Sequence, residues 1–351
     1  MTLNYHRMQL PREVIVGKGI IDRVIEVLGR LGLMRSALIV TGSKTYSIAG
    51  QVVEGLLIDE DIEVKKFLVQ STTVEEVEAV EKKIKELKPQ VVFGVGGGTK
   101  IDIAKLGSAN QGIPFISIPT TASHDGIASP FSSVKGSEQP YSVMAQAPIA
   151  ILADTDIIMQ APQRYFISGC GDVIAKFTSV KDWKLAHEKK DEYYGDYAAS
   201  LALMSAKLVM KNIESIHSQE EEGVRILLEA LISCGVAMSI AGSSRPCSGS
   251  EHLFSHALDM IQPNQALHGE QCGVGTIMMA YLHNEDWEHI KSTLSILGAP
   301  TNAQQLGVDK KDVIEALELS SNIRSERYTI LNDLDLNRQG YEEMARATGV
   351  I

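Results

Sequence analysis

Aspartate and histidine residues in the second half of the chain have the types expected of a metal site. His252 and His256 are four residues apart, which places both on one face of a helix. Asp172 follows glycines at the start of an apolar segment, and His268 precedes another. One carboxylate and two imidazoles can hold Zn²⁺ or Fe²⁺ and leave a coordination position open. The spacing is not a local metal motif, so by itself it favours core or helix-capping histidines.

A glycine run has the context of a phosphate site. The apolar segment Val91–Val95 leads into Gly96, Gly97 and Gly98, and a helix follows. Glycines let the backbone approach a phosphate, and the helix N-terminus offers N–H groups and a positive dipole end. The run matches neither the Rossmann fingerprint nor the Walker pattern. A tight strand-to-helix turn without a ligand is the alternative.

A second polar segment, Thr120–Gly126, follows the apolar stretch Phe115–Ile118. It contains hydroxyl groups, a histidine and an aspartate at the carboxyl end of an expected strand. Ligands of open α/β sheets bind at such ends. A turn begun by Pro119 with an aspartate cap is the alternative interpretation.

Alternating strands and helices must position these groups in the first 160 residues. Residues 37–41, 91–95, 115–118 and 149–152 are expected strands. Apolar residues at helical spacing predict a helix that starts at a capping box, Thr73 with Glu76, and stops before Pro89. This alternation predicts a parallel sheet. The turn-rich stretch 132–148 is expected to be a hairpin or a surface loop.

After Pro162 the strand pattern disappears. Successive helices are expected over residues 197–216, 224–240, 251–261 and 273–282. We therefore expect an α/β Rossmann-like nucleotide-binding domain over 1–160. An all-α domain with the metal and substrate residues is expected over 161–351.

The amino-acid composition limits the kinds of partner that the protein is expected to bind. The 351 residues, 44% hydrophobic and 22% charged, suit about two globular domains. The net charge of −11 argues against nucleic acid or an anionic membrane as main partner. No apolar run was found that reaches the roughly 18 residues of a membrane helix, and the N-terminus lacks signal-peptide features, so we expect no membrane insertion and a cytoplasmic protein. Four separated cysteines indicate free thiols and argue against a zinc–cysteine site.

Taken together, the motifs resemble those of archaeal-type sn-glycerol-1-phosphate dehydrogenases. That family belongs to the dehydroquinate synthase-like and iron-containing alcohol dehydrogenase superfamily. The matching segments span nearly the whole chain and keep their order. They are Gly96-Gly97-Gly98 with Asp102, Pro119-Thr120 with Ser123-His124-Asp125-Gly126, Gly171-Asp172, Glu192–Tyr197, Ser244-Arg245-Pro246, Gly249-Ser250-Glu251-His252, His268-Gly269-Glu270 and Arg327–Leu331.

The resemblance implies a dehydroquinate synthase-like fold with the active site between its two domains. It implies one Zn²⁺ per subunit, held by Asp172, His252 and His268, and substrate contacts from Asp125, Asp172 and His256. The implied catalytic residues are Asp172, His252, His256 and His268. The implied NAD(P)H-binding positions are Gly97, Gly98, Thr99, Lys100, Ile101, Asp102, Thr120, Thr121, Ala122, Ser123 and Ser129.

The resemblance also implies the reaction, reduction of dihydroxyacetone phosphate to sn-glycerol 1-phosphate for archaeal ether phospholipids. A glycerol or alcohol dehydrogenase and a dehydroquinate synthase-type lyase are the alternatives, and a homo-oligomer is expected. His256 is a candidate proton relay, since an imidazole pKa near 6.5 suits that role. Lys176, Arg245 and Arg327 are candidates for the substrate phosphate.

The residues after the strand at 37–41 bear on cofactor choice. Relatives that prefer NAD often carry an aspartate here for the ribose hydroxyls. This chain has Gly42, Ser43 and Lys44, with no carboxylate to repel a 2′-phosphate. We therefore expect NADPH to be accepted at least as well as NADH.

Overall fold

The structure is a computed structural model that describes residues 6–134 and 142–351. The chain divides into two compact units, residues 1–162 and 163–351. Each unit is described by itself.

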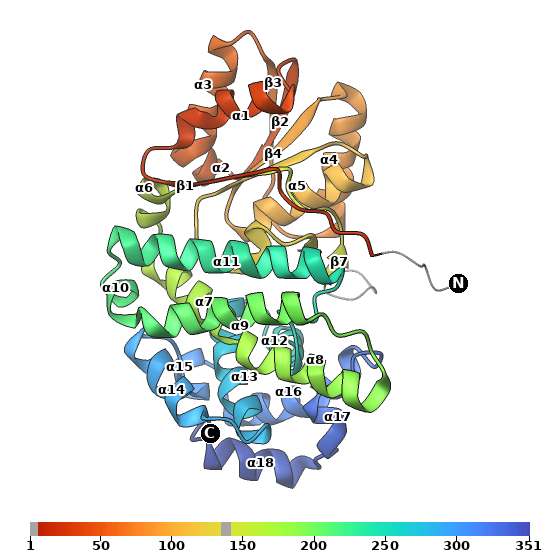
Figure 1. Ribbon diagram of the computed structural model, residues 1–351, viewed down its shortest axis with the longest axis vertical. Helices are drawn as coiled ribbons and strands as arrows, with labels where there is room; N and C mark the ends of the chain where they lie inside the picture. The colour runs from red at the N-terminus through yellow and green to blue at the C-terminus, as the bar shows by residue number, and fades with distance from the viewer. Residues whose placement is uncertain (1–5, 135–141) are drawn as a thin grey trace. The chain divides into compact units, whose positions relative to one another are not determined.

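Unit 1 is built on a six-stranded sheet with the order β1-β8-β5-β4-β2-β3, in which every pairing is parallel. β6 and β7 form a separate antiparallel hairpin. The strands are β1 (Glu13–Gly17), β2 (Ser36–Thr41), β3 (Glu63–Leu68), β4 (Val91–Gly96), β5 (Phe115–Pro119), β6 (Phe131–Ser133), β7 (Ser142–Met144) and β8 (Ala150–Asp154). Figure 1 shows the sheet strands between their connecting helices.

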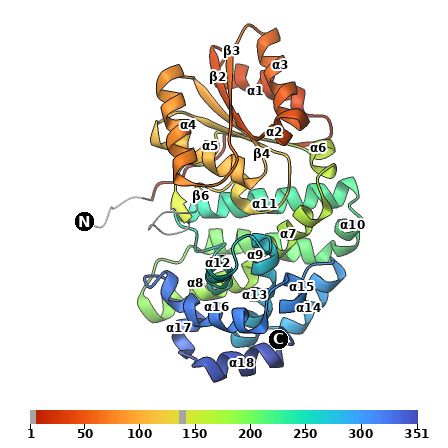
Figure 2. The same cartoon turned by 180° about the vertical axis from the view of Figure 1, so that it is seen from behind.

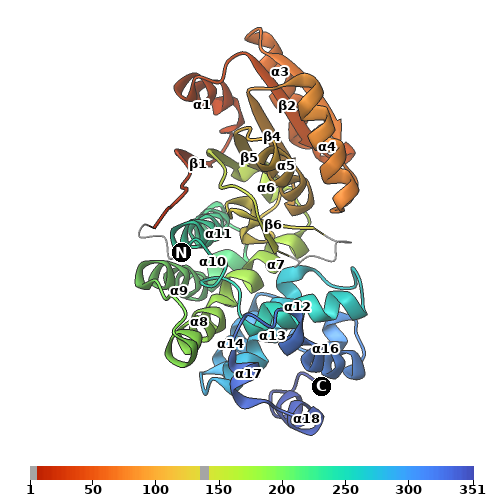
Figure 3. The ribbon, with the colours of Figure 1, turned by 90° about the vertical axis from the view of Figure 1, so that its right-hand side faces the viewer.

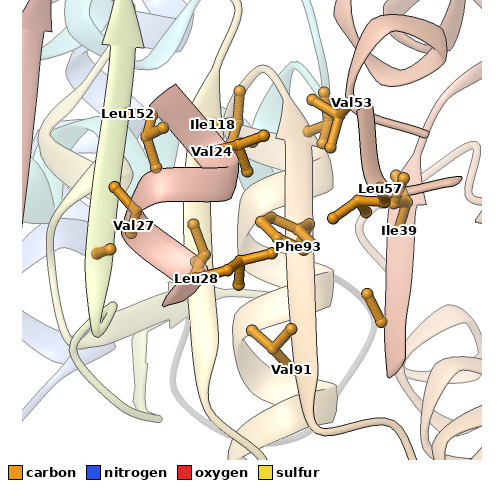
Figure 4. Close-up of a cluster of buried hydrophobic side chains, with 14 of the residues drawn as sticks. Val24, Val27, Leu28, Ile39, Val53, Leu57, Val91, Phe93, Ile118 and Leu152 are labelled. Carbon is orange, nitrogen blue, oxygen red and sulfur yellow. The ribbon is translucent and has the colours of Figure 1, made fainter. Parts of the chain in front are cut away.

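Helices cover both faces of this sheet, as parallel connections require. α1 and α3 lie on one face and α4 and α5 on the other (Figure 2). Figure 4 shows α1 and α3 contributing Val24, Leu28 and Leu57 to a buried cluster with Phe93 of β4. The helical segments of unit 1 are η1 (Ile21–Arg23), α1 (Val24–Leu31), α2 (Ser43–Thr45), η2 (Tyr46–Gly50), α3 (Gln51–Asp59), α4 (Val74–Leu87), α5 (Gly98–Asn110), η3 (Asp125–Ile127) and α6 (Thr155–Met159).

Unit 2 consists of helices without a strand, and the structure describes all of its residues. α12 packs against α13 and α16, and these three helices lie together in Figure 3. The helices are α7 (Gln163–Ile174), α8 (Lys176–Lys190), α9 (Asp196–Lys211), α10 (Ile213–His217), α11 (Glu221–Ala241), α12 (Ser250–Ile261), α13 (His268–Leu282), α14 (Trp287–Ile296), α15 (Ala303–Leu306), α16 (Lys310–Ile323), α17 (Ile330–Leu334) and α18 (Arg338–Ala347).

The expected fold class is confirmed, and the four expected strands are β2, β4, β5 and β8. The stretch 132–148 contains the β6–β7 hairpin, and its residues 135–141 lie outside the described part of the chain. The prediction of a capping box at Thr73 was wrong. Thr73 is the N-cap of α4, but Glu76 accepts a hydrogen bond from the backbone N–H of Gln70 instead.

The expectation that no segment has membrane-helix length and composition needs correction. α11 is 21 residues long and has a mean hydropathy of 1.8 in its most apolar window. Of that window, 67% is buried in the protein, and α11 packs along α9 and α7. Such burial is typical of a core helix.

Candidate nucleotide site and metal centre

The glycine run lies where the strand order of the sheet reverses. The chain leaves β2 to form β3 on one side, then returns to form β4 on the other side of β2. Ligands of open α/β sheets bind beyond the carboxyl ends of strands at such a point. β4 ends at Gly96, Gly97 is the N-cap, and α5 begins at Gly98. Because the first N–H groups of a helix lack intrahelical partners, this turn can bind an anion.

The loop after β5 lies against the same turn. The backbone N–H of Thr120 donates to the carbonyl of Gly96 at 3.0 Å. A Cβ atom on Gly98 would lie 1.8 Å from Nε2 of His124, and one on Gly97 would lie 3.2 Å from Oγ1 of Thr121. A side chain at Gly98 would require the His124 ring to move, because His124 fills that space. The structure thus brings together the two segments that the sequence proposed separately.

Other predicted cofactor residues have their side chains engaged within unit 1. Ile101 and Ala122 are buried, and Oγ of Ser123 lies 3.4 Å from Oγ1 of Thr121. Oγ of Ser129 accepts from the backbone N–H of Phe131 at 3.0 Å. Contact of these residues with a cofactor remains a prediction.

Asp102 has a positioning role that the sequence did not indicate. Its carboxylate accepts from Nζ of the fully buried Lys105 at 3.1 Å and from the backbone N–H of Ser133 at 3.3 Å. Lys105 also donates to the carbonyls of Gly126 and Phe131, at 2.8 and 2.6 Å. This pair fastens the segment after Asp125 to α5. Burial lowers the pKa of Lys105, which the charge of Asp102 partly offsets.

The end of β2 lies next to the end of β4, beside the glycine turn. Oγ1 of Thr41 donates to the carbonyl of Val95 at 2.8 Å, which ties the ends of β2 and β4 together. Lys44 is exposed just beyond Gly42. Nζ of Lys100, in the first turn of α5, donates to the carbonyl of Gln70 at 3.3 Å.

In unit 2, two glycines bring the proposed metal ligands together. A Cβ atom on Gly171 would lie 2.2 Å from the carbonyl oxygen of Gly269, and one on Gly269 would lie 1.8 Å from that of Ser168. α7 and α13 therefore touch backbone to backbone at this crossing. Asp172 and His268 are the sequence neighbours of these glycines, so the close approach places them in one cluster.

His252 is oriented by the residue before it. Its Nδ1 lies 2.8 Å from Oε1 of Glu251, a fully buried carboxylate that also accepts from Gly249 N and from Thr178 Oγ1. A carboxylate only accepts hydrogen bonds, so Nδ1 carries the proton. Nε2 lies 3.5 Å from Oδ1 of Asp172 and is the nitrogen that a metal would bind in place of a proton.

His268 is oriented in a similar way from the neighbouring helix. Its Nδ1 lies 3.1 Å from Oγ of Ser255, and this hydroxyl donates to Oε1 of Gln271 at 2.6 Å. The amide nitrogen of Gln271 donates in turn to Asp259 at 3.1 Å. Since the one hydroxyl proton of Ser255 goes to Gln271, Ser255 accepts from Nδ1 of His268. Nε2 of His268 is then the nitrogen whose lone pair a metal would bind.

The electrostatics of this cluster suit a cation. Burial raises the pKa of Asp172, but the charges of Lys176 and His252 lower it more, so the net shift is well below the usual value. Burial lowers the pKa of His252, but Cys272 and Asp172 raise it well above the usual value. The carboxylate and two Nε2 atoms are the donor set of a catalytic Zn²⁺ or Fe²⁺ site. The residues present therefore fit a divalent metal.

His256 lies one helical turn after His252, with ring centroids 6.5 Å apart, and its ring stacks 6.1 Å from that of His268. Burial and the positive charges of His252, Arg327 and Arg324 lower its pKa to about 3. The ordinary imidazole pKa near 6.5 therefore does not apply to His256, because burial and these three charges all lower it. His256 is therefore a neutral imidazole at neutral pH.

The three cations proposed for the substrate phosphate are used inside the protein. Lys176 is fully buried and donates to Asp172 at 2.7 Å and to the carbonyl of Cys247 at 3.2 Å. Arg245 is buried in a bidentate pair with Glu192. Arg327 is buried and donates to Oγ of Ser244 at 2.6 Å and to the carbonyl of Ser248. These contacts support the structural interpretation of all three.

Several functional contacts were missed from the sequence. No role was predicted for Arg164, which donates to the carboxylate of Glu270 through two nitrogens at 2.6 and 2.8 Å. Glu270 also accepts from the backbone N–H of Leu267, so this pair fixes the turn that begins at His268. Sequence adjacency to His252 could have suggested Glu251. Nothing in the sequence pairs Ser255 with Gln271.

Comparison with known proteins gives the structural class to which this chain belongs. A family model described as iron-containing alcohol dehydrogenase matches residues 15–162, which cover the sheet and glycine turn. The crystal structure of a glycerol dehydrogenase from Schizosaccharomyces pombe superposes with a TM-score of 0.83 at 20% identity, covering 99% of this chain and 91% of that one. A sulfoacetaldehyde reductase from Bifidobacterium kashiwanohense in complex with NAD+ gives 0.73 at 17% identity, covering 99% of each chain. This likeness establishes the iron-containing alcohol dehydrogenase fold.

Sequence relatives define the family within that class. The glycerol-1-phosphate dehydrogenase (NAD(P)+) of Pyrococcus furiosus is 54% identical over 346 residues, covering 99% of this chain and all of that protein. That of Thermococcus kodakarensis is 53% identical over 352 residues, covering both chains fully. The chain belongs to the glycerol-1-phosphate dehydrogenase family, which confirms the resemblance inferred from its motifs.

Proposed function

We propose that the protein catalyses the NAD(P)H-dependent, metal-assisted reduction of dihydroxyacetone phosphate to sn-glycerol 1-phosphate, which supplies the backbone of archaeal ether phospholipids. The observation that carries this choice of substrate is the 54% identity over 99% of the chain with a glycerol-1-phosphate dehydrogenase. Asp172 and His252 are buried, and His268 is partly buried beside His252. This cluster supports a metal-assisted reaction at a carbonyl group.

Residues of unit 2 prepare the site for charge on the substrate oxygen. A divalent cation, proposed to be Zn²⁺, supplies Lewis-acid stabilisation of negative charge that develops when hydride reaches the carbonyl carbon. Asp172, His252 and His268 would hold this cation. Glu251 and Ser255 hold the imidazoles of His252 and His268 through Nδ1, so Nε2 is the nitrogen that would bind the cation.

His256 supports proton delivery without becoming charged. A neutral imidazole donates a proton from one ring nitrogen and accepts one at the other, so it can connect the alkoxide oxygen of the product to solvent. The low pKa of about 3 makes a free imidazolium a rare species at neutral pH. We therefore propose a relay through the neutral ring rather than general-acid catalysis by a stored proton.

Residues of unit 1 are proposed to bind the nucleotide. The turn Gly97–Thr99 and the first N–H groups of α5 would receive the pyrophosphate. The end of β2, with exposed Lys44 and no carboxylate from Thr41 to Lys44, would receive the adenosine ribose. This arrangement supports the use of NADPH as well as NADH.

Arg324 is the cation we propose for the substrate phosphate. Its side chain keeps 18% exposure and pairs through Nε with Glu326 at 2.8 Å. It follows α16, which packs against the histidine helix α12, and its charge helps to lower the pKa of His256. A guanidinium that retains solvent access and whose charge acts on His256 suits a dianionic phosphate.

The protein is further proposed to be a cytoplasmic homo-oligomer. Its four cysteines are free and buried, which suits a reducing compartment. Tyr197, Met204 and Leu208 are large exposed apolar residues at helical spacing on α9. Such a stripe supports contact with a second copy of the chain.

One assay tests the reaction. Purified, zinc-loaded protein is mixed with dihydroxyacetone phosphate and NADPH or NADH, and absorbance of the reduced nucleotide is followed. Net oxidation is expected, with sn-glycerol 1-phosphate as the product in chiral analysis. Turnover of unphosphorylated dihydroxyacetone alone would favour a glycerol dehydrogenase. Conversion of a substrate without net nucleotide oxidation would favour a synthase-type lyase.

A further inference from the structure

Lys105 is a charged residue in the middle of α5 whose side chain is fully buried. Its ammonium group donates to Oδ1 of Asp102 at 3.1 Å and to the carbonyls of Gly126 and Phe131 at 2.8 and 2.6 Å. A lysine ammonium has three protons, so these three contacts use its whole donor capacity. Burying a charge without partners is strongly unfavourable, and these contacts offset that cost. Two of the three partners belong to the segment after β5, so the buried charge holds that segment against α5.

The peptide groups at Gly126 are held from both sides. The carbonyl accepts from Lys105, and the N–H donates to Nδ1 of His124 at 2.9 Å. A Cβ atom on Gly126 would lie 2.3 Å from Cε1 of His124, so the imidazole ring packs directly on this glycine. The backbone N–H groups of residues 128 and 129 both donate to the carbonyl of Asp125 at 3.0 Å. The backbone around Asp125 is therefore fixed, at the carboxyl edge of the sheet where α/β proteins bind ligands.

The position of Lys105 excludes direct contact with either ligand of the proposed reaction. The nucleotide turn begins α5 at Gly98, seven residues before Lys105, which corresponds to about 10 Å along a helix axis. The ammonium group is fully buried, so a substrate that enters from solvent does not reach it. Burial lowers the pKa of Lys105, and the charges of Asp102 and Asp125 oppose that shift. The carboxylate of Asp125 therefore lies within electrostatic reach of the buried ammonium group.

We propose that Lys105 is a positioning residue for the substrate, which holds residues 124–131 so that Asp125 presents its carboxylate in one orientation. The inference rests on the proposed function, with Asp125 as a proposed substrate contact, and adds the group that keeps this contact in place. His124 acts from the other side, because its ring also fills the space over Gly98 and so links this segment to the nucleotide turn. A displacement of about 1 Å in a reacting geometry can cost about 100-fold in rate.

Separate measurements of substrate and nucleotide distinguish this role from a general structural one. Lys105→Met keeps a side chain of similar length and removes the three donors. We expect kcat/KM for dihydroxyacetone phosphate to fall about 10- to 100-fold with KM raised, while the Kd of NADPH, followed by its fluorescence, stays unchanged. Lys83→Met, in an exposed pair with Glu86 on α4, is the matched control and is expected to change neither value. Equal losses for substrate and nucleotide in Lys105→Met, or no loss in either, would overturn the proposal.

A double variant separates the contacts to the segment from the buried charge. Lys105→Met leaves the carboxylate of Asp102 buried without its cation, which destabilises a fold. Asp102→Asn combined with Lys105→Met removes both charges and still leaves the carbonyls of Gly126 and Phe131 without their donor. The same loss of kcat/KM for dihydroxyacetone phosphate is expected. Recovery of the wild-type value in the double variant would overturn the proposal, because the loss would then come from the unpaired carboxylate.

Hydrogen exchange of the wild type tests the proposal even where a variant fails to fold. The amides of Ala128 and Ser129, which donate to Asp125, are expected to exchange much more slowly than in an unstructured chain. Mass spectrometry of peptides that span residues 124–131 measures this exchange. Exchange at the unstructured rate would overturn the role of Lys105 and leave the proposed function intact. Slow exchange without reduction of dihydroxyacetone phosphate by the wild type would overturn the proposed substrate and keep the role of Lys105 in holding this segment.

Discussion

Nδ1 of His252 lies 2.8 Å from a carboxylate oxygen of its own sequence neighbour, Glu251, which is fully buried. This contact fixes the orientation of the imidazole before any metal binds. We predict that Glu251→Gln lowers zinc affinity about 10- to 100-fold, the usual effect of losing a partner behind a metal-binding histidine. Chelator competition measures this change. Glu222→Gln, on the exposed surface of α11, is the control and is expected to leave affinity unchanged.

Asp182 organises the framework around this site. Its buried carboxylate accepts from the N–H and hydroxyl of Ser250 at 2.7 and 2.5 Å, from Ile330 N at 2.7 Å and from His283 at 3.1 Å. Asp182→Asn replaces an acceptor oxygen by an NH₂ group that faces donors, so unfolding free energy is expected to fall by about 2–4 kcal/mol. Denaturant unfolding measures it. Asp286→Asn, at the exposed N-cap of α14, should change stability little, since Asn caps as well as Asp.

His256 predicts a pH dependence of stability. Its pKa of about 3 in the folded chain lies below the usual 6.5. Between these values the imidazole binds a proton in the unfolded chain but not in the folded chain. Stability from this group is therefore present above pH 6.5 and is lost as the pH falls. Between pH 7 and 5 the metal-stripped wild type is expected to lose about 2 kcal/mol more than His256→Asn. Urea unfolding at pH 7 and pH 5 measures both losses. If the wild type and His256→Asn lost the same unfolding free energy between these pH values, the lowered pKa would be contradicted.

Cofactor choice is predicted to depend on charge after β2. Ser43→Asp introduces a carboxylate at an exposed position beside Lys44. Repulsion of a 2′-phosphate by about 1.4 kcal/mol would lower kcat/KM for NADPH about tenfold relative to NADH. Ser47→Asp, one helical turn away and also exposed, is the control. The same loss with both nucleotides from Ser43→Asp would place the adenosine ribose elsewhere.

The sequence predicted the elements better than the side-chain partners, for physical reasons. Continuous apolar runs identified the buried strands β2, β4, β5 and β8, while β3 was missed because three of its six residues are charged and none of the six is buried. Apolar periodicity likewise found α9 and α11–α13. These patterns report burial, which residue types encode directly.

The site required information that spacing does not carry. The proposed ligands Asp172 and His268 come near each other because Gly171 and Gly269 let two helices cross in contact, and a helix crossing has no local sequence pattern. For the same reason Lys176 was interpreted as a phosphate ligand. Its position four residues after Asp172 correctly predicts a shared face, but that face is the interior, where the ammonium group pairs with the aspartate.

Arg324 provides a prediction that separates binding from chemistry. If its guanidinium binds the substrate phosphate, Arg324→Gln is expected to raise KM for dihydroxyacetone phosphate about 10- to 100-fold, since hydrogen bonds to charged groups contribute about 1.5–3 kcal/mol. Turnover of unphosphorylated dihydroxyacetone should change little, because that molecule carries no phosphate group for Arg324 to bind. Arg338→Gln, in an exposed pair with Glu318, is the matched control. Equal effects on both substrates would instead indicate that Arg324 maintains the turn beside α12.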